Sequence, residues 1–180
     1  NADIVPGTRV PAILAIRPDN TILFQSPFME GGQGIWTAMA QIVGEELDAD
    51  PASFTVENAP TGRDYQVVRG IGRITGGSMS VRTSYDTMRK LGAIARAMLV
   101  QAAAGKLGVP AGELTTEPGR VLHKASGRAL TYGELAPAAM DMPAPANVVL
   151  KDPKTFRWIG KPQARLDVRA KSTGKAQFSI

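Results

Sequence analysis

The residues with the clearest chemical potential form a glycine-rich stretch from Gly31 to Gly34, in which Gln33 is the one other residue type. The stretch follows an apolar, strand-like run and precedes an amphipathic helix pattern that begins near Ile35. Glycine permits positive φ and close approach of a ligand to the main chain, and the first turn of a helix offers free N–H groups to an anion. We therefore predict a loop that presses its backbone against a phosphate; the alternative is a simple turn from strand to helix.

A second glycine-rich stretch, Gly76-Gly77-Ser78, also precedes a helix pattern. Ser78 or a neighbouring residue is suited to cap that helix by accepting hydrogen bonds from its first amides. Two helix N-termini can converge on one anion, so we expect the two loops to meet in space. The first stretch has neither the G-x-G-x-x-G nor the P-loop lysine pattern, which argues against a dinucleotide or a nucleoside triphosphate as its ligand.

Composition excludes several kinds of site. The chain has 180 residues, no cysteine and one histidine, His123. It therefore offers no disulfide, no thiolate metal site, no cysteine nucleophile and no histidine-rich metal site. Because His123 lies in a short strand-like run, we expect its ring to pack or to face water rather than to act in catalysis.

The net charge of +5 is concentrated at one end of the chain. Residues 151–180 carry eight basic and two acidic side chains, whereas residues 1–150 carry 13 basic and 14 acidic ones. The basic residues alternate with prolines, Phe156 and Trp158, which suits an extended segment on an acidic or phosphate-bearing surface as well as a solvated tail. No recognition-helix or zinc-finger pattern accompanies the charge, so nucleic acid is not an expected partner. No run approaches the roughly 20 apolar residues of a membrane span.

The elements that position the first loop can be read from the periodicity of apolar residues. Runs over Val10–Arg17 and Thr21–Gln25 flank a turn rich in proline, aspartate and asparagine, and predict a β-hairpin. Residues 34–47 have the pattern of a helix with an apolar face and a largely acidic opposite face. Alternation over Ser53–Glu57 predicts a further strand.

A long helix positions the second loop. Residues 58–76 lack periodicity and predict a loop of about twenty residues, a length typical of functional or disordered segments. The spacing of apolar residues then predicts a helix from about Ser78 to Gly105. Gly92 falls within its apolar stripe, where the missing side chain would let another backbone come close; the alternative is a glycine that only weakens the helix.

The remaining patterns complete the predicted fold. Runs over Leu114–Glu117 and Arg120–Lys124 predict a second hairpin, and a capping box at Thr131 predicts a short helix after it. The density of proline in the last part of the chain predicts an extended linker. We therefore predict an α+β domain over residues 3–140, with helices packed on one face of a small mixed sheet. An extended Pro-rich basic tail over residues 141–180 should follow it and lead into a next domain.

The order of these motifs resembles the order found in a known family. The chain is similar to the molybdenum hydroxylases of the xanthine dehydrogenase and aldehyde oxidoreductase superfamily, specifically the molybdopterin-binding large subunit of the isoquinoline 1-oxidoreductase type. Residues Glu30–Thr37 resemble that family's E-x-G-Q-G-x-x-T block, and Gly76–Arg82 resemble its second cofactor loop. Four later segments resemble the linker into the family's next domain: Leu150–Pro153, Ile159–Pro162, Arg165–Asp167 and Lys171–Ala176. The resemblance covers nearly the whole chain and implies a fragment of a longer subunit; Gly31 departs from it, because the family often carries a larger apolar residue there.

The resemblance also implies a cofactor and its contacts. The cofactor would be molybdopterin cytosine dinucleotide with molybdenum, bound by backbone, amide and hydroxyl groups of Gly32, Gln33, Gly34, Gly77, Ser78 and Ser80. An amide side chain suits the mixed donor and acceptor edge of a pterin, and serine hydroxyls and helix amides suit phosphate oxygens. The alternative for Ser78 and Ser80 is a role as helix caps alone. In this family the pterin holds the metal, so we assign no metal ligand to the chain.

The resemblance further implies an oxidoreductase that hydroxylates aldehydes or N-heteroaromatic compounds with oxygen from water, with a glutamate as base. That glutamate belongs to a later region in the family, and Glu30 is better suited to a capping or loop-holding role, so no catalytic residue is assigned here. The fragment should be inactive alone. The implied partners are the rest of the large subunit, a small [2Fe–2S] subunit and, in some members, a cytochrome c subunit. The family is bacterial, which slightly favours a periplasmic or membrane-associated location after twin-arginine export over a cytoplasmic one.

Functions of other classes stay open at this point. The chain could be a non-enzymatic interaction domain whose basic tail docks on a partner protein, with Phe156 and Trp158 as the aromatic contacts. Binding of nucleic acid is a third hypothesis, and it predicts an affinity that falls steeply with salt.

Overall fold

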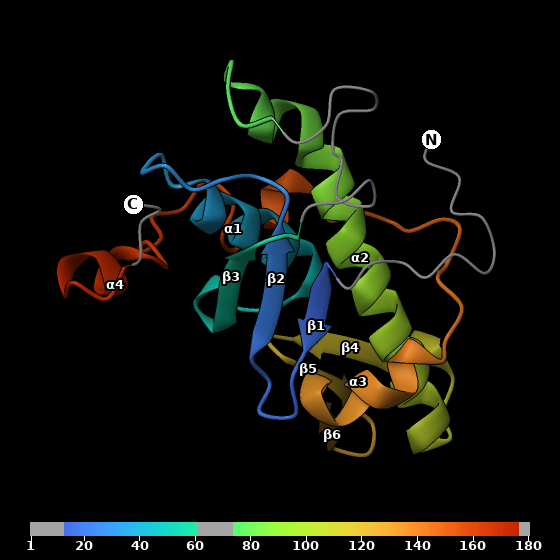
Figure 1. Cartoon of the computed structure of the whole chain (residues 1–180). Helices are drawn as coiled ribbons and strands as arrows, with labels where there is room; N and C mark the ends of the chain where they lie inside the picture. The colour runs from blue at the N-terminus through green and yellow to red at the C-terminus, as the bar shows by residue number, and fades with distance from the viewer. Residues whose placement is uncertain (1–12, 61–73, 177–180) are drawn as a thin grey trace.

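The computed structural model describes residues 13–60 and 74–176, which build two small sheets joined by a long helix (Figure 1). The first sheet has the order β1-β2-β3, with β1 over Leu14–Ile16, β2 over Ile22–Ser26 and β3 over Phe54–Asn58. Strands β1 and β2 are antiparallel, which confirms the predicted hairpin. Strands β2 and β3 are parallel, so the sheet is mixed, as predicted.

The connection from β2 to β3 determines where the first loop lies. It passes through α1 (Ile35–Leu47) and a short 3₁₀ turn over Pro51–Ser53, as a crossover between parallel strands requires. The last residues of the two strands, Ser26 and Asn58, are paired in register. The carboxyl ends of β2 and β3 therefore meet at one edge of the sheet, which is where ligand-binding loops gather in open sheets with such crossovers.

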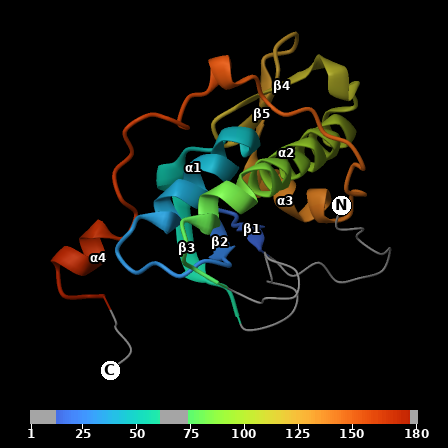
Figure 2. The same ribbon diagram turned by 90° about the horizontal axis from the view of Figure 1, so that it is seen from above.

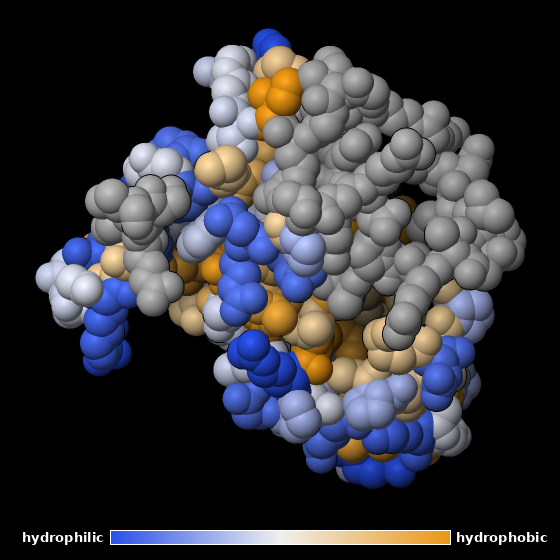
Figure 3. Space-filling model, in the orientation of Figure 1, coloured by the Kyte–Doolittle hydropathy of each residue, from blue (hydrophilic) through white to orange (hydrophobic). Residues whose placement is uncertain are grey.

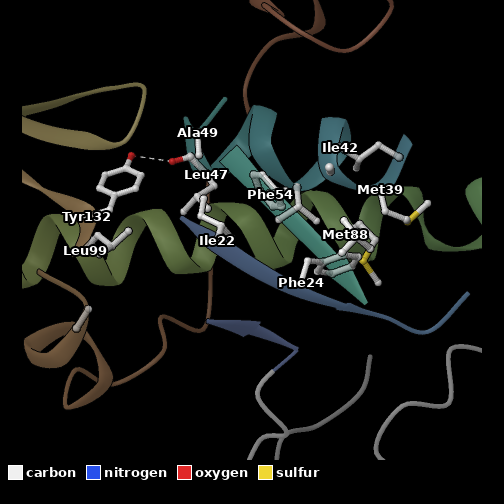
Figure 4. Packing of buried hydrophobic residues seen from close by; sticks show 14 of the residues in the cluster. Ile22, Phe24, Met39, Ile42, Leu47, Ala49, Phe54, Met88, Leu99 and Tyr132 are labelled. Atoms are coloured by element: carbon white, nitrogen blue, oxygen red, sulfur yellow. Dashed lines mark hydrogen bonds between the residues drawn. The ribbon is translucent and has the colours of Figure 1, made fainter. Parts of the chain in front are cut away.

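The second helix packs across the first. Helix α2 (Met79–Leu107) lies against α1 along much of that helix, and its first turns project beyond the rest of the molecule (Figure 1). A Cβ atom on Gly92 would overlap the carbonyl oxygen of Val43 and would lie 3.0 Å from the amide nitrogen of Leu47. The prediction that Gly92 lets another backbone come close is confirmed. Four elements contribute large side chains to the core at this level, as Figure 4 shows: Phe24, Met39, Phe54 and Met88.

The second sheet lies at the other end of α2. It is antiparallel, in the order β4 (Leu114–Glu117), β5 (Arg120–His123) and β6 (Arg128–Thr131), and α3 (Tyr132–Met140) follows it directly. The α+β class and the second hairpin are confirmed, but we predicted one sheet where the structure has two. The side chains of β6 are mostly exposed, so its sequence carries none of the alternation that reveals a strand.

A capping box and one hydrogen bond to α1 hold α3 in place. Thr131 and Glu134 form the predicted capping box, in which the amide of Thr131 donates to Glu134 Oε2 at 2.7 Å and the amide of Glu134 donates to Thr131 Oγ1 at 3.3 Å. The hydroxyl of Tyr132 donates to the carbonyl of Leu47 at 2.7 Å and joins α3 to the end of α1 (Figure 4). Burial raises the pKa of Tyr132 far above its ordinary value, so this hydroxyl stays a donor.

The end of the chain returns to α1. Residues 143–167 include a 3₁₀ turn at Pro153–Thr155 and lead into the short helix α4 (Val168–Ser172). We call residues 150–167 the strap. Figure 2 shows that the strap runs along α1 on the side turned away from α2. The extended tail that we predicted is therefore not confirmed, because these residues pack on the domain.

Two further expectations concern the surface and the longest loop. No helix in the described part of the chain has both the length and the apolar content needed to cross a membrane. Figure 3 shows apolar surface on the projecting end of α2, and the exposed apolar residues of this region are Ile74 and Val81. The predicted loop over residues 58–76 falls mostly on residues 61–73, which lie outside the described residues.

Candidate functional site

One hydrogen bond joins the segments that precede the two glycine loops. The backbone amide of Met29, which precedes the first loop, donates to Thr75 Oγ1, which precedes the second loop, at 2.9 Å. Met29 follows β2, and Thr75 leads into α2. The structure therefore brings together the residues that precede the two loops, which lie 46 positions apart in the sequence; Gly32, Gln33 and Gly34 follow the first, and Gly77, Ser78 and Ser80 follow the second.

The first loop is held by a carboxylate of its own chain. Glu30 Oε1 accepts hydrogen bonds from the amides of Gly32 and Gly34, at 2.8 and 3.0 Å, and Glu30 Oε2 accepts one from the amide of Trp36 at 3.2 Å. Gly32 and Gly34 have φ of 110° and 84°, conformations that favour glycine. Burial opposes ionisation of Glu30, but the three amide donors outweigh burial and hold the pKa of the carboxyl below its ordinary value.

The side chain of Gln33 is also used inside this loop. Its Oε1 accepts from the amide of Gly31 at 2.7 Å, and its Nε2 donates to the carbonyl of Met29 at 2.8 Å. The amide groups that we expected to meet a ligand at Gly32, Gln33 and Gly34 are thus paired within the loop. Gly32 and Gln33 are exposed, so a ligand can reach the outer surface of the loop without displacing these bonds.

The second loop is more open. Gly76, Gly77 and Ser78 are exposed, and Ser80 is half-buried in the first turn of α2. Ser78 occupies the N-cap position, but its hydroxyl makes no capping hydrogen bond, so the predicted cap role is wrong for this side chain. Capping needs an extended N-cap backbone, whereas Ser78 has a left-handed one with φ of 54°.

The donors of the second loop fit the molybdopterin that the family resemblance implies. They combine the N-terminus of a 29-residue helix, preceded by the exposed residues Gly76 and Gly77, with a serine hydroxyl that makes no capping bond. Helix amides and hydroxyls suit phosphate oxygens and the polar edge of a pterin. The first loop fits through its exposed surface, because Glu30 already occupies its amides. Within residues 13–60 and 74–176, no group of three or more His, Cys, Asp or Glu side chains could hold a metal ion.

The strap covers the acidic face of α1. Glu45 and Glu46 have no exposed surface at all. Glu45 accepts hydrogen bonds from three consecutive strap amides, those of Arg157, Trp158 and Ile159, at 2.7–3.2 Å. Arg89 Nε donates to Glu46 Oε1 at 2.8 Å, and the amide of Lys151 donates to the same carboxylate.

The two strap residues that we considered for docking on a partner, Phe156 and Trp158, contact this chain instead, the first through its ring and the second through its backbone. The ring of Phe156 lies 5.0 Å from the guanidinium carbon of Arg89. The carbonyl of Trp158 accepts a hydrogen bond from Gln41 Nε2 at 3.0 Å. The acidic surface that we proposed for an extended basic segment is thus the polar face of this chain's own α1.

Other residues singled out in the sequence lie elsewhere or were missed. His123 is buried in β5, with Nδ1 2.7 Å from Ser126 Oγ and Nε2 3.1 Å from Glu113 Oε2. Arg165, in the strap, contacts both Gly32 and Glu30, and sequence reasoning gave it no role. The available signal was charge complementarity between the strap and α1.

Comparison with known proteins gives the family. A family model described as a molybdopterin cofactor-binding domain matches residues 4–173. The isoquinoline 1-oxidoreductase subunit beta of Brevundimonas diminuta is 33% identical over 94% of this chain and 27% of its own length. The membrane-bound aldehyde dehydrogenase [pyrroloquinoline-quinone] of Gluconacetobacter polyoxogenes is 30% identical over 92% of this chain and 21% of its own length.

A solved structure agrees with these relatives. The Cu,Mo-CO dehydrogenase superposes with a TM-score of 0.50 and 26% identity, over 68% of this chain and 15% of that chain. The chain thus spans 27% and 21% of the two curated relatives. With a family model that covers almost all of its residues, the chain belongs to the molybdopterin cofactor-binding domain family of the molybdenum hydroxylases.

Proposed function

We propose that the chain forms one wall of the cofactor site in the large subunit of a molybdenum hydroxylase. The observation that carries the proposal is the hydrogen bond between Met29 and Thr75, which joins the segments before the two glycine loops. The contacts to the cofactor would come from both loops, through Gly32, Gln33, Gly34, Gly77, Ser78 and Ser80.

The two loops would have different tasks. The open second loop binds through the amides of α2 and the hydroxyl of Ser78, which makes no capping bond. The first loop, held in shape by Glu30, presents its exposed backbone at Gly32 and Gln33. The bound cofactor supplies the two-electron redox chemistry, and the residues of this chain hold and orient it. No catalytic residue is assigned to this chain.

The names of relatives support a substrate class. One relative is named for isoquinoline and another for aldehydes, so we propose aldehydes or N-heteroaromatic compounds as substrates, hydroxylated with oxygen from water. The cofactor would be the cytosine dinucleotide form of molybdopterin. Partners would be the rest of the large subunit, a small [2Fe–2S] subunit and in some cases a cytochrome c subunit. We also propose a periplasmic or membrane-associated location after twin-arginine export.

The test uses the full-length subunit purified with its partners. We expect molybdenum in the wild-type enzyme and cytidine monophosphate after acid hydrolysis of its cofactor. The double variant S78A/S80A should bind the cofactor roughly tenfold more weakly or worse, because hydrogen bonds to a charged group are lost. The control T83A removes an exposed hydroxyl one turn further along α2 and should keep the wild-type molybdenum content.

Three outcomes would contradict the proposal. The first is a wild-type enzyme that contains pyrroloquinoline quinone, the cofactor in the name of one relative, and no molybdenum. The second is a wild-type molybdenum content in S78A/S80A. The third is submicromolar binding of the cofactor to the 180-residue chain alone, measured by calorimetry, because a single wall of a site should bind weakly.

A further inference from the structure

The strap reaches the first glycine loop through one guanidinium group. Arg165 Nη1 donates to the carbonyl of Gly32 at 2.6 Å, and Arg165 Nη2 lies 3.3 Å from Glu30 Oε1. Glu30 in turn accepts the amides of Gly32 and Gly34. Arg165 therefore contacts the backbone of the loop and also the carboxylate that holds the loop's amides.

The guanidinium is itself held in a fixed orientation. Asp167 accepts from Arg165 Nε at 2.9 Å and from Nη2 at 2.7 Å, a bidentate pair that fixes the plane of the group. Lys171 pairs with Asp167 from the next turn. The hydrogen bonds from Arg165 and the charge of Lys171 outweigh burial and hold the pKa of Asp167 far below its ordinary value.

The backbone beside Arg165 is docked on α1. The amide of Leu166 donates to Oγ1 of Thr37, a buried residue in the first turn of α1, at 3.2 Å. Further back along the strap, Gln41 Nε2 donates to the carbonyl of Lys161 at 3.1 Å. The position of the guanidinium thus follows from the docking of the strap, and the strap and the loop meet at the start of the same helix.

An open cleft of about 400 Å³ lies beside this contact, lined by Gly32, Arg165, Val168, Lys171 and Ser172. Its two cationic side chains, Arg165 and Lys171, both pair with Asp167, and Arg165 also lies against Glu30, so each cation already has a carboxylate partner in this chain. This arrangement favours a role for Arg165 in holding the loop over direct capture of an anion in the cleft.

We propose that Arg165 is a positioning residue for the first glycine loop: it couples the conformation of residues 30–34 to the docked strap. The inference rests on the function proposed above, in which this loop borders the cofactor. It adds a residue that lies more than 130 positions from the loop in the sequence and touches the loop rather than the cofactor. Arg165 and the loop should therefore behave as one unit.

The first test measures amide hydrogen exchange by NMR in the 180-residue chain, so it needs no cofactor. In R165Q, exchange at Gly32 and Gly34 should rise roughly tenfold, because both the carbonyl contact and the charge beside Glu30 are lost. R165K keeps the positive charge but lacks the planar guanidinium with its paired N–H donors, so its exchange rates should lie between those of the wild type and R165Q. R169Q removes an exposed cation from α4 and should leave the loop unchanged. Wild-type exchange in R165Q, or equal effects of R165Q and R169Q, would overturn the inference.

The second test uses the full-length enzyme with its partners. R165Q should lower the molybdenum content several-fold relative to R169Q, and R165K should recover part of it. A loosened loop with wild-type molybdenum content would overturn the role of Arg165 in cofactor binding. Failure of the proposed function is distinguishable, since it appears as the absence of molybdenum from the wild-type enzyme, whatever the exchange data show.

Discussion

Glu30 shows how one residue changes the interpretation of a glycine-rich motif. The glycine-rich sequence before α1 predicts backbone amides that bind an anion. In the structure this anion is the carboxylate of Glu30, which accepts hydrogen bonds from the amides of Gly32, Gly34 and Trp36. A phosphate at this helix end would compete with a side chain that is already tethered beside it. The loop-holding role that we predicted for Glu30 agrees with these contacts. We infer that charged groups of the cofactor bind at the second loop, where Ser78 makes no capping bond.

The contribution of Glu30 can be measured through its pH dependence. The pKa of Glu30 is lowered in the folded state, so its ionised form stabilises the fold above the unfolded-state pKa, and this contribution is lost as the pH falls through the folded-state pKa. E30Q should lower the free energy of unfolding by about 1–2 kcal/mol at pH 7, because hydrogen bonds to a charged acceptor are lost. Urea denaturation from pH 7 down to pH 3 should show the two proteins converging. A constant difference at every pH would contradict this account.

At the scale of elements, the crossing of α1 and α2 depends on a residue without a side chain. A Cβ on Gly92 would overlap the carbonyl oxygen of Val43 and lie 3.0 Å from Glu46 Cβ. Backbone cannot move aside here without shifting Glu46, whose carboxylate pairs with Arg89. The close approach of the two helices and the burial of their polar contacts are therefore linked.

G92A should test this link directly. We expect it to lower the free energy of unfolding by about 1–3 kcal/mol, because an added methyl group overpacks the crossing. Gly105 lies in the same helix, and a Cβ added to it would have nothing within 4 Å, so G105A should stabilise the protein by about 0.5–1 kcal/mol through helix propensity. Thermal unfolding followed by circular dichroism gives both values. A stability of G92A equal to or above that of G105A would contradict the close packing at the crossing.

The elements that sequence analysis predicted are those specified by neighbouring residues. Both hairpins, the long helix α2 and the capping box at Thr131 follow from turn residues, periodicity and local hydrogen bonds. The third strand of the second sheet was not predicted, because β6 has mostly exposed side chains and becomes a strand only by pairing with β5. Burial of the acidic face of α1 was not predicted, since buried carboxylates are rare unless they are paired. The partners of Glu45 are strap amides more than 100 positions away, which no local pattern reveals.

At the scale of the whole molecule, the strap, which lies in the basic part of the chain, packs on α1 as part of the fold. Buried Glu45 receives three consecutive strap amides, and Lys151 Nζ lies 3.3 Å from Asp48 Oδ1. The strap then continues to Arg165 and the first loop. The site is therefore built from segments at the start, middle and end of the chain, and its geometry depends on the strap staying docked.

Replacing Glu45, whose carboxylate binds the strap, with a neutral residue should detach the strap from α1. In E45Q, the new amide nitrogen would face a backbone donor in a fully buried position, so we expect a loss of about 2–4 kcal/mol in the free energy of unfolding. Trypsin should then cleave more rapidly after Arg157, whose amide is bound to Glu45 in the wild type. E57Q changes an exposed carboxylate in β3 and should stay within about 0.5 kcal/mol of the wild type, with unchanged cleavage. Equal tryptic rates in the strap of E45Q and E57Q would mean that Glu45 does not hold the strap, and the dependence of the glycine loop on strap docking would lose its basis.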